Sequence, residues 1–306
     1  MSDGTIEGLD CSYYQGQIDW AKVAKAGKRF AIIRSGDGKF LDPMFETYIQ
    51  GALAAGVAVP GVYHYLRFAL DPESHADICA RRLEQAKKLG AKDFLWLDWE
   101  DTSAQAKAMT VQQRQQWASE FLDSLEKNND CYNYGHYTGA WWFQPYLDTV
   151  TTCTVKLQDQ FFEHPLWIAA YVGLPIMEGV RPILPKDWAD WQVWQYTSSG
   201  RVDGIEGNVD LDIAREGFLD LKEGDMSGFS QVQLNEMRAI IAKAISDAAD
   251  NKGHWDDIEM AARGAVSTPI LKTFLSAITG HWENLVGDLD DIEKVAKQWS
   301  RWSRPD

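Results

Sequence analysis

The chain has 306 residues, of which 45% are hydrophobic and 25% charged, and these proportions are ordinary for a globular protein. Its formal net charge of −15 argues against nucleic acid and anionic membrane surfaces as partners, because both attract basic proteins. No stretch approaches the length and apolarity of a membrane span, so no membrane insertion is expected.

The length allows one large α/β domain and a smaller unit. The sequence also contains 14 tryptophans, an unusually high number. Sugar rings have apolar faces that pack on aromatic side chains, so this excess fits a carbohydrate-binding protein. It fits a heavily aromatic core equally well.

Two features bear on the cellular compartment. Four cysteines, Cys11, Cys79, Cys131 and Cys153, have wide and irregular spacing without a CxxC pair, which predicts buried thiols and no zinc site. The N-terminus lacks a basic segment followed by an apolar one, so no secretory signal is expected. Both features indicate synthesis in the cytoplasm.

Eight short apolar and aromatic segments predict β-strands, and helical segments separate the early ones. The strands are expected at residues 5–12, 30–35, 57–66, 94–99, 133–138, 166–172, 191–197 and 209–213. Helices are expected at residues 19–27, 45–55, 72–89 and 110–127. Long helical segments become rare between the later strands. This order predicts an α/β fold, a TIM-like irregular β/α barrel of about eight strands with helices mainly in its first half.

The strand at residues 94–99 leads into the most informative pair, Asp98 and Glu100. Side chains alternate along a strand, so both acids are expected on the face of Trp96, with Trp99 on the other face. A carboxylate after an apolar strand is costly unless it is paired, hydrogen-bonded or at the opening of a cavity. Two acids in unlike surroundings can divide acid and base roles, as glycoside hydrolysis requires. Taken alone, the pair also fits a strand end that meets solvent.

Further acids occupy other predicted strands. Asp10 lies near the end of the first strand, and Asp210 and Asp212 lie in the last. Active sites of TIM-like barrels are built at the C-terminal ends of the strands. The acids are therefore expected to gather at one end of the barrel.

Six sequence motifs follow one another along the predicted barrel. They are GLDCSYYQG at 8–16, GVYHY at 61–65, LDWE at 97–100, LWIAAY at 166–171, WQYTSSG at 194–200 and DGIEGNVDLD at 203–212. Each is weak alone, but their order and spacing resemble the family 25 glycoside hydrolases, the Chalaropsis-type lysozymes of fungi, bacteria and bacteriophages. The resemblance covers roughly residues 5–220.

The resemblance implies an N-acetylmuramidase that hydrolyses the β-1,4 bond between N-acetylmuramic acid and N-acetylglucosamine in peptidoglycan. Carried over by motif, Glu100 is the general acid, and its pKa is expected to be raised. Asp98 is the carboxylate that stabilises positive charge at the reacting sugar, either by direct attack or by orienting the substrate's acetamido group. Asp10 and Asp210 match the family's other two acids, while Asp212 is interpreted as bonding to a loop.

Aromatic and amide side chains around the acids are the predicted substrate-binding residues. They are Tyr63, Tyr137, Trp167, Tyr171, Trp194 and Gln195. Packing in the barrel core is about as good an interpretation for any one of them, and His64 is interpreted as structural. Calcium-loop spacing is absent from the sequence, so no metal and no cofactor are expected.

The character of the sequence changes after residue 222. Residues 1–222 are predicted to form the catalytic barrel, residues 223–229 a polar linker, and residues 230–306 a small all-helical module with apolar stripes. A module that binds the cell wall and one that serves self-association are both compatible with this pattern.

Two functional alternatives differ from an active lysozyme. A catalytically silent, lectin-like glycan binder on the same barrel is possible, because a fold does not guarantee its chemistry. A purely structural protein is the third. All four family acids are present, which favours the enzyme. With no predicted signal, the resemblance implies a protein made in the host cytoplasm that acts on the bacterial cell wall after release, as bacteriophage endolysins do.

Overall fold

The computed structural model describes residues 5–220, apart from residues 128, 130, 149–152, 173–179, 187 and 216. The chain divides into two units, Met1–Gly228 and Phe229–Asp306, and the described residues all belong to the first. The predicted linker at 223–229 and helical module at 230–306 therefore lie outside the described residues and stay predictions.

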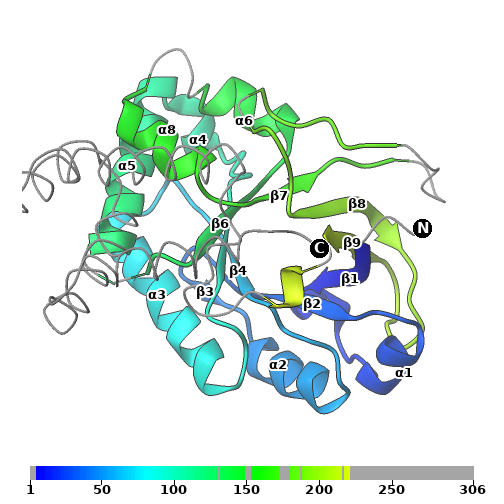
Figure 1. Ribbon diagram of the computed structural model, residues 1–306. Coiled ribbons are helices and arrows are strands. Elements are labelled where there is room, and N and C mark those ends of the chain that lie inside the picture. Colours follow the sequence, from blue (N-terminus) through cyan, green and yellow to red (C-terminus); the bar gives the residue numbers. More distant parts are fainter. Residues whose placement is uncertain are drawn as a thin grey trace, which may run out of the picture. The chain divides into compact units, whose positions relative to one another are not determined.

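Eight strands close into a β-barrel in the first unit (Figure 1). They are β1 (Thr5–Cys11), β2 (Phe30–Asp37), β4 (Val62–Tyr65), β5 (Leu95–Asp98), β6 (Tyr134–Thr138), β7 (Leu166–Ala169), β8 (Val193–Gly200) and β9 (Val209–Arg215). The barrel closes because β1 pairs with both β2 and β9. All eight strands were predicted, and the barrel is confirmed. The sequence did not reveal β3 (Phe40–Leu41), a two-residue strand antiparallel to β2, because two residues carry no periodic signal.

The last strand runs against the others, which decides where its acids lie. Strands β1, β2 and β4 to β8 pair in parallel, whereas β9 is antiparallel to both β8 and β1. The start of β9 therefore lies at the barrel end where the parallel strands finish. In this register Asp210 pairs with Asp10. Asp210 thus joins the other acids from the N-terminal end of its strand.

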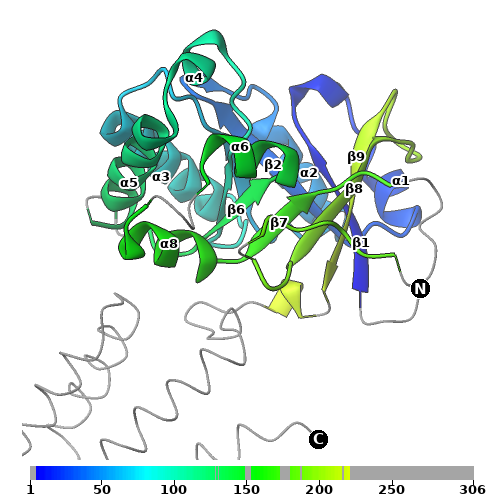
Figure 2. The ribbon, with the colours of Figure 1, turned by 90° about the horizontal axis from the view of Figure 1, so that it is seen from above.

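Helices cover the barrel mainly on the side of its early strands. The α-helices are α1 (Trp20–Lys25), α2 (Phe45–Ala54), α3 (Pro72–Lys88), α4 (Ala104–Ala108), α5 (Val111–Lys127), α6 (Ala140–Tyr146) and α8 (Val155–Phe162), and the 3-10 helices are η1 (Tyr13–Gln15) and η2 (Phe218–Asp220). The four predicted helices correspond to α1, α2, α3 and α5. Figures 1 and 2 show α2, α3 and α5 along the outside of the early strands, with no long helix beside β8 and β9. Among the described helices, none is long and apolar enough to cross a membrane.

The long helix α3 illustrates how local sequence fixes these elements. Asp71 caps its start by accepting a hydrogen bond from the Ser74 backbone N–H at 2.9 Å, and Pro72 occupies the first turn. Gly90 follows its end with a φ of +97°, a conformation that favours glycine. These signals are why the helix was predicted within one residue of its observed end.

Two apolar layers stabilise the barrel, one beneath the helices and one inside it. The inner layer contains the rings of Phe30, Trp96, Trp167 and Phe218, all at most 1% exposed. A Cβ atom at Gly135 would lie 2.5 Å from the Trp96 ring, so glycine makes room for that indole. Large aromatic side chains therefore fill the interior of the barrel.

The buried cysteines serve packing and not chemistry. Cys11, Cys79 and Cys131 are buried thiols, as predicted, whereas Cys153 is only half-buried. Burial raises the pKa of all three, that of Cys131 to about 12. Thiolate is the nucleophilic form, so these side chains are poor nucleophiles at neutral pH.

Candidate active site

The structure brings the predicted acids to one end of the barrel. Asp10 is next to the last residue of β1, Asp98 is the last residue of β5, and Asp210 is the second residue of β9. Glu100 follows β5 by two residues, and Asp212 lies two residues further along β9. We call these five residues the acid cluster.

The faces of β5 are as the sequence predicted. Trp96 packs in the inner apolar layer, whereas Leu97 and Trp99 pack in the outer one. The strand itself ends at Asp98, so Glu100 belongs to the following loop. The Asp98 side chain is only 4% exposed, while Glu100 is half-buried. The two carboxyl groups therefore have unlike surroundings.

Asp98 is buried in a way that leaves part of its carboxyl group unused. Its Oδ1 atom is buried and has no hydrogen-bond partner among the described residues. Burial and the charges of Glu100 and Asp37 raise its pKa, while the positive charges of Arg34 and Arg67 oppose the rise. An unpaired buried acceptor is costly, so its retention points to a ligand that supplies the missing interaction.

Glu100 is suited to hold a proton at neutral pH. Burial, followed by the charge of Asp210, raises its pKa to about 7. Burial raises the pKa of Asp210 to about 6. A carboxyl group that keeps its proton near pH 7 can act as a general acid under physiological conditions.

Gln195 connects three of the predicted residues. The hydroxyl groups of Tyr137 and Tyr171 each donate to Gln195 Oε1 at 2.9 Å, and Gln195 Nε2 donates to Asp10 Oδ2 at 2.7 Å. The amide is held by two donors on one side and so directs its own N–H at the acid. Tyr137, Tyr171 and Gln195 are thus gathered beside the acid cluster. Tyr171 is 57% exposed and can meet a ligand directly.

Asp212 is part of the barrel interior, which corrects the interpretation that it bonds to a loop. It is fully buried and accepts a hydrogen bond from Trp167 Nε1 at 2.8 Å. Burial, with a smaller contribution from the charge of Asp210, raises its pKa to about 8. Trp167 is 1% exposed, so it supports the acids from below and offers no surface to a sugar.

The other two predicted aromatic residues lie in different places. Tyr63 faces the barrel interior, is half-buried, and packs edge-on against Trp167 at 5.8 Å between ring centres. Burial and then the charge of Asp10 raise the Tyr63 pKa, which places this phenol near the acids. Trp194 is 1% exposed, packs in the outer layer and donates to the Ala170 carbonyl oxygen at 2.7 Å. The structure does not bring Trp194 to the acid cluster.

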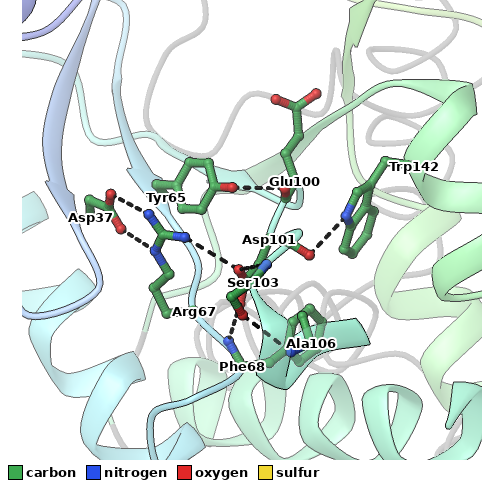
Figure 3. Close-up of polar contacts among 9 residues, drawn as sticks. All are labelled: Asp37, Tyr65, Arg67, Phe68, Glu100, Asp101, Ser103, Ala106 and Trp142. Atoms are coloured by element: carbon green, nitrogen blue, oxygen red, sulfur yellow. Dashed lines mark hydrogen bonds and ion pairs between the residues drawn. The ribbon is translucent and has the colours of Figure 1, made fainter. Parts of the chain in front are cut away.

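Some residues at the site escaped sequence reasoning. Tyr65 lies opposite Asp98 in the register, and its hydroxyl donates to the Glu100 carbonyl oxygen at 2.7 Å. Arg67 places its guanidinium over the Tyr65 ring and contacts Asp101 (Figure 3). Asp101 follows Glu100 directly. The sequence signal for its role was therefore a third acid within residues 98–101.

One group of potential metal ligands lies apart from the acid cluster. His64, His75 and Cys79 are buried, and one donor atom of each lies within 4.8 Å of the others. Both ring nitrogens of His64 already have partners, Ser35 Oγ at 2.9 Å and the Gly38 carbonyl oxygen at 3.0 Å. His64 is therefore held by protein groups as a structural residue, and we assign no metal to this group.

Comparison with known proteins finds a matching family and similar relatives. The sequence signature of the glycosyl hydrolases family 25 matches residues 9–205. Lysozyme M1 of Streptomyces globisporus is 27% identical over 67% of this chain and 66% of its own length. The autolytic lysozyme of Clostridium acetobutylicum is 31% identical over 70% of this chain and 57% of its own length. The catalytic domain of an endolysin from a Listeria monocytogenes bacteriophage is similar in structure, with a TM-score of 0.53 and 25% identity over 72% of this chain and 98% of that domain.

Proposed function

Because this chain belongs to the glycosyl hydrolases family 25, we propose that it is a peptidoglycan N-acetylmuramidase, a lysozyme that acts on the bacterial cell wall. Its relatives in Streptomyces and Clostridium carry the name lysozyme. The observation that carries the proposal is the difference between two neighbouring acids. Asp98 is buried with an unused acceptor, whereas Glu100 is half-buried and has a pKa of about 7. Two carboxyl groups in unlike surroundings are what the hydrolysis of a glycosidic bond requires.

The proposed reaction divides the work between these acids. Glu100 donates its proton to the glycosidic oxygen as the bond to the muramic acid anomeric carbon breaks. Asp98 stabilises the positive charge that develops on that sugar, for which its unpaired Oδ1 is available. A water molecule then adds to the anomeric carbon and returns a proton to Glu100, which completes the hydrolysis. Asp10, held by Gln195, and Asp210, which pairs with Asp10 across β1 and β9, complete the acid cluster around the reacting ring. Tyr137 and Tyr171 fix Gln195, and Tyr171 also offers an exposed ring to the glycan.

Identification of the cleaved bond tests the proposal. The purified protein is expected to release soluble fragments from peptidoglycan, with N-acetylmuramic acid at each new reducing end and with unchanged rates in EDTA. Borohydride reduction followed by mass spectrometry of the fragments identifies that end. New N-acetylglucosamine reducing ends would assign a different bond. Binding to peptidoglycan without any release would instead favour the silent, lectin-like alternative.

We further propose that the barrel acts without residues 230–306, which attach it to the wall or to other copies of the chain. A protein of residues 1–222 is expected to melt cooperatively and to cleave solubilised glycan at close to the full-length rate. The reason is that the acid cluster and its supporting contacts all lie within the described residues up to Asp220. Calorimetry and turnover on soluble glycan measure this, while wall pull-down and light scattering measure what the removed residues contribute.

Phe218 supplies a matched control for this truncation. Its ring is fully buried inside the barrel, 5.5 Å from Phe30 and 6.2 Å from Trp96 between ring centres. A protein of residues 1–215 lacks this ring and is expected to lose several kcal/mol of stability, since removing a buried phenylalanine side chain costs about 3–5 kcal/mol. If the 1–222 protein were as unstable as the 1–215 protein, the later residues would belong to the fold of the barrel. Unchanged wall binding and unchanged particle mass would refute both roles proposed for them.

A further inference from the structure

Glu100 lies beyond the end of its strand, yet the main chain around it is held at every step. Each carbonyl oxygen from residue 98 to residue 101 accepts a hydrogen bond from a donor outside this segment. The donors are Leu66 N to Asp98 at 3.0 Å, Thr138 Oγ1 to Trp99 at 3.1 Å, Tyr65 Oη to Glu100 at 2.7 Å and Trp142 Nε1 to Asp101 at 3.1 Å. None of these bonds uses the Glu100 carboxyl group. The backbone is fixed while the reactive side chain stays available.

The carboxyl group of Asp101 is the centre of this arrangement. It is 1% exposed and meets donors on both oxygens. It accepts from the Phe68 N–H at 3.0 Å, the Ser103 N–H at 3.0 Å, the Ser103 hydroxyl at 3.2 Å and Arg67 Nη1 at 3.3 Å. Figure 3 shows the Glu100 side chain extending away from these contacts. Asp101 thus ties the loop after Glu100 to the segment that follows β4.

Arg67 extends these contacts to two further strands. Its Nε and Nη2 atoms donate to the two oxygens of Asp37 at 2.5 and 2.7 Å, a bidentate pair at the end of β2. Its guanidinium carbon lies 4.3 Å from the centre of the Tyr65 ring, whose hydroxyl contacts the Glu100 carbonyl oxygen. A bidentate pair and a cation–π contact both fix orientation. The guanidinium therefore contacts two residues that hold the main chain at Glu100, namely Asp101 and Tyr65.

We propose that Asp101 is a positioning residue for the general acid: together with Arg67 and Tyr65 it fixes the backbone from which the Glu100 side chain projects. The inference rests on the proposed function of Glu100. A proton donor must lie within hydrogen-bond reach of the glycosidic oxygen, and Glu100 has no strand pairing to hold it there. A misplacement of 1 Å can lower a rate by about 10²-fold.

Two substrates with different leaving groups separate positioning from general loss of structure. Asp101→Asn is expected to lower turnover of natural glycan by about 10–100-fold. It should affect turnover of a nitrophenyl glycoside of the same muramic-acid-terminated oligosaccharide far less, because nitrophenolate leaves without a proton. Glu100→Gln serves as the reference, since removal of the acid itself should give the same selectivity with a larger loss on glycan.

Glu126→Gln is the matched structural control. Glu126 is another buried carboxyl group, 5% exposed, that accepts from Tyr134 Oη at 2.6 Å and Gln160 Nε2 at 3.1 Å. Tyr134 begins β6, so this group lies at the barrel end opposite the acid cluster. Its replacement is expected to lower the melting temperature without favouring either substrate.

The outcomes distinguish this inference from the proposed function. Asp101→Asn with equal losses on both substrates, or with no loss, overturns the positioning role when Glu100→Gln is selective. A Glu100→Gln protein that loses both activities equally overturns the role of Glu100 itself. Should Asp101→Asn fail to fold, Tyr65→Phe removes only the hydroxyl that contacts the Glu100 carbonyl oxygen. Selective loss in that variant supports the inference, and unselective loss or full activity overturns it.

Discussion

Glu100→Gln is expected to lower turnover of peptidoglycan glycan by about 10²–10⁴-fold while the protein stays folded. The substitution removes the acidic proton but keeps the size of the side chain and its place in the loop that follows β5. The fold should tolerate it, because burial raises the pKa of Glu100 to about 7 and a neutral amide costs less to bury than a carboxylate. Release of reducing ends from soluble glycan measures the rate, and thermal melting checks the fold.

The pH profile gives an independent reading of the same assignment. Wild-type turnover should fall as the pH rises through about 7, where Glu100 loses its proton, given that its pKa is about 7. The residual activity of Glu100→Gln should lack this alkaline fall. Glu84→Gln is the matched control, because Glu84 is an exposed acid that pairs with Lys87 on α3 and should keep the wild-type profile. Retention of more than about a tenth of wild-type activity by Glu100→Gln would show that another group donates the proton.

The barrel could be predicted because its local signals agree with its long-range pairing. Each of the eight strands is an apolar or aromatic run with a turn signal beside it, and the four predicted helices have clear start or stop signals. The acids could be placed because they stand at strand ends. The short helices α4, α6 and α8 were not predicted, since five to eight residues hold too few turns for a periodic signal and none of these helices has a glycine stop of the kind that Gly27 gives the equally short α1.

Strand alternation separates two neighbouring residues that were both predicted to bind substrate. Trp194 and Gln195 are neighbours on β8, so only one of them can face the barrel interior. Gln195 contacts Asp10, and Trp194 packs outward in the apolar layer beneath the helices. Alternation along β8 therefore places Gln195, and not Trp194, on the face of the acid cluster.

Other features of the site were beyond local reasoning. Arg67 and Asp101 meet although 34 positions separate them, and Gln195 and Asp10 meet across 185. Such contacts depend on which strands become neighbours and on the register between them. The sequence shows that Asp101 is acidic, but only the folded barrel shows that its carboxyl group is buried among four donors.

Asp212→Asn is expected to stabilise the protein at alkaline pH relative to wild type. Burial raises the pKa of Asp212 from an ordinary 3.8 to about 8 in the folded protein. Between these values the folded chain holds a proton that the unfolded chain has released. The stability associated with that proton is complete below pH 4 and is lost as the pH rises through about 8. Asparagine cannot ionise, and its carbonyl oxygen can still accept from Trp167 Nε1. The Asp212→Asn protein therefore does not lose this stability as the pH rises.

Melting temperatures at pH 5 and pH 8 measure this effect. The difference between Asp212→Asn and wild type should increase by several degrees from pH 5 to pH 8, since each pKa unit corresponds to about 1.4 kcal/mol and each kcal/mol to about 2–4 °C in a domain of this size. Asp71→Asn is the control, because Asp71 is an exposed helix cap away from the acid cluster. Its difference from wild type should be nearly the same at both pH values. A constant difference for Asp212→Asn would mean that the folded protein ionises Asp212 as easily as the unfolded chain does. An increase would instead show that the natural carboxyl group weakens the fold at neutral and alkaline pH, which an acid beside Asp10 is expected to do if it is retained for the chemistry of the site.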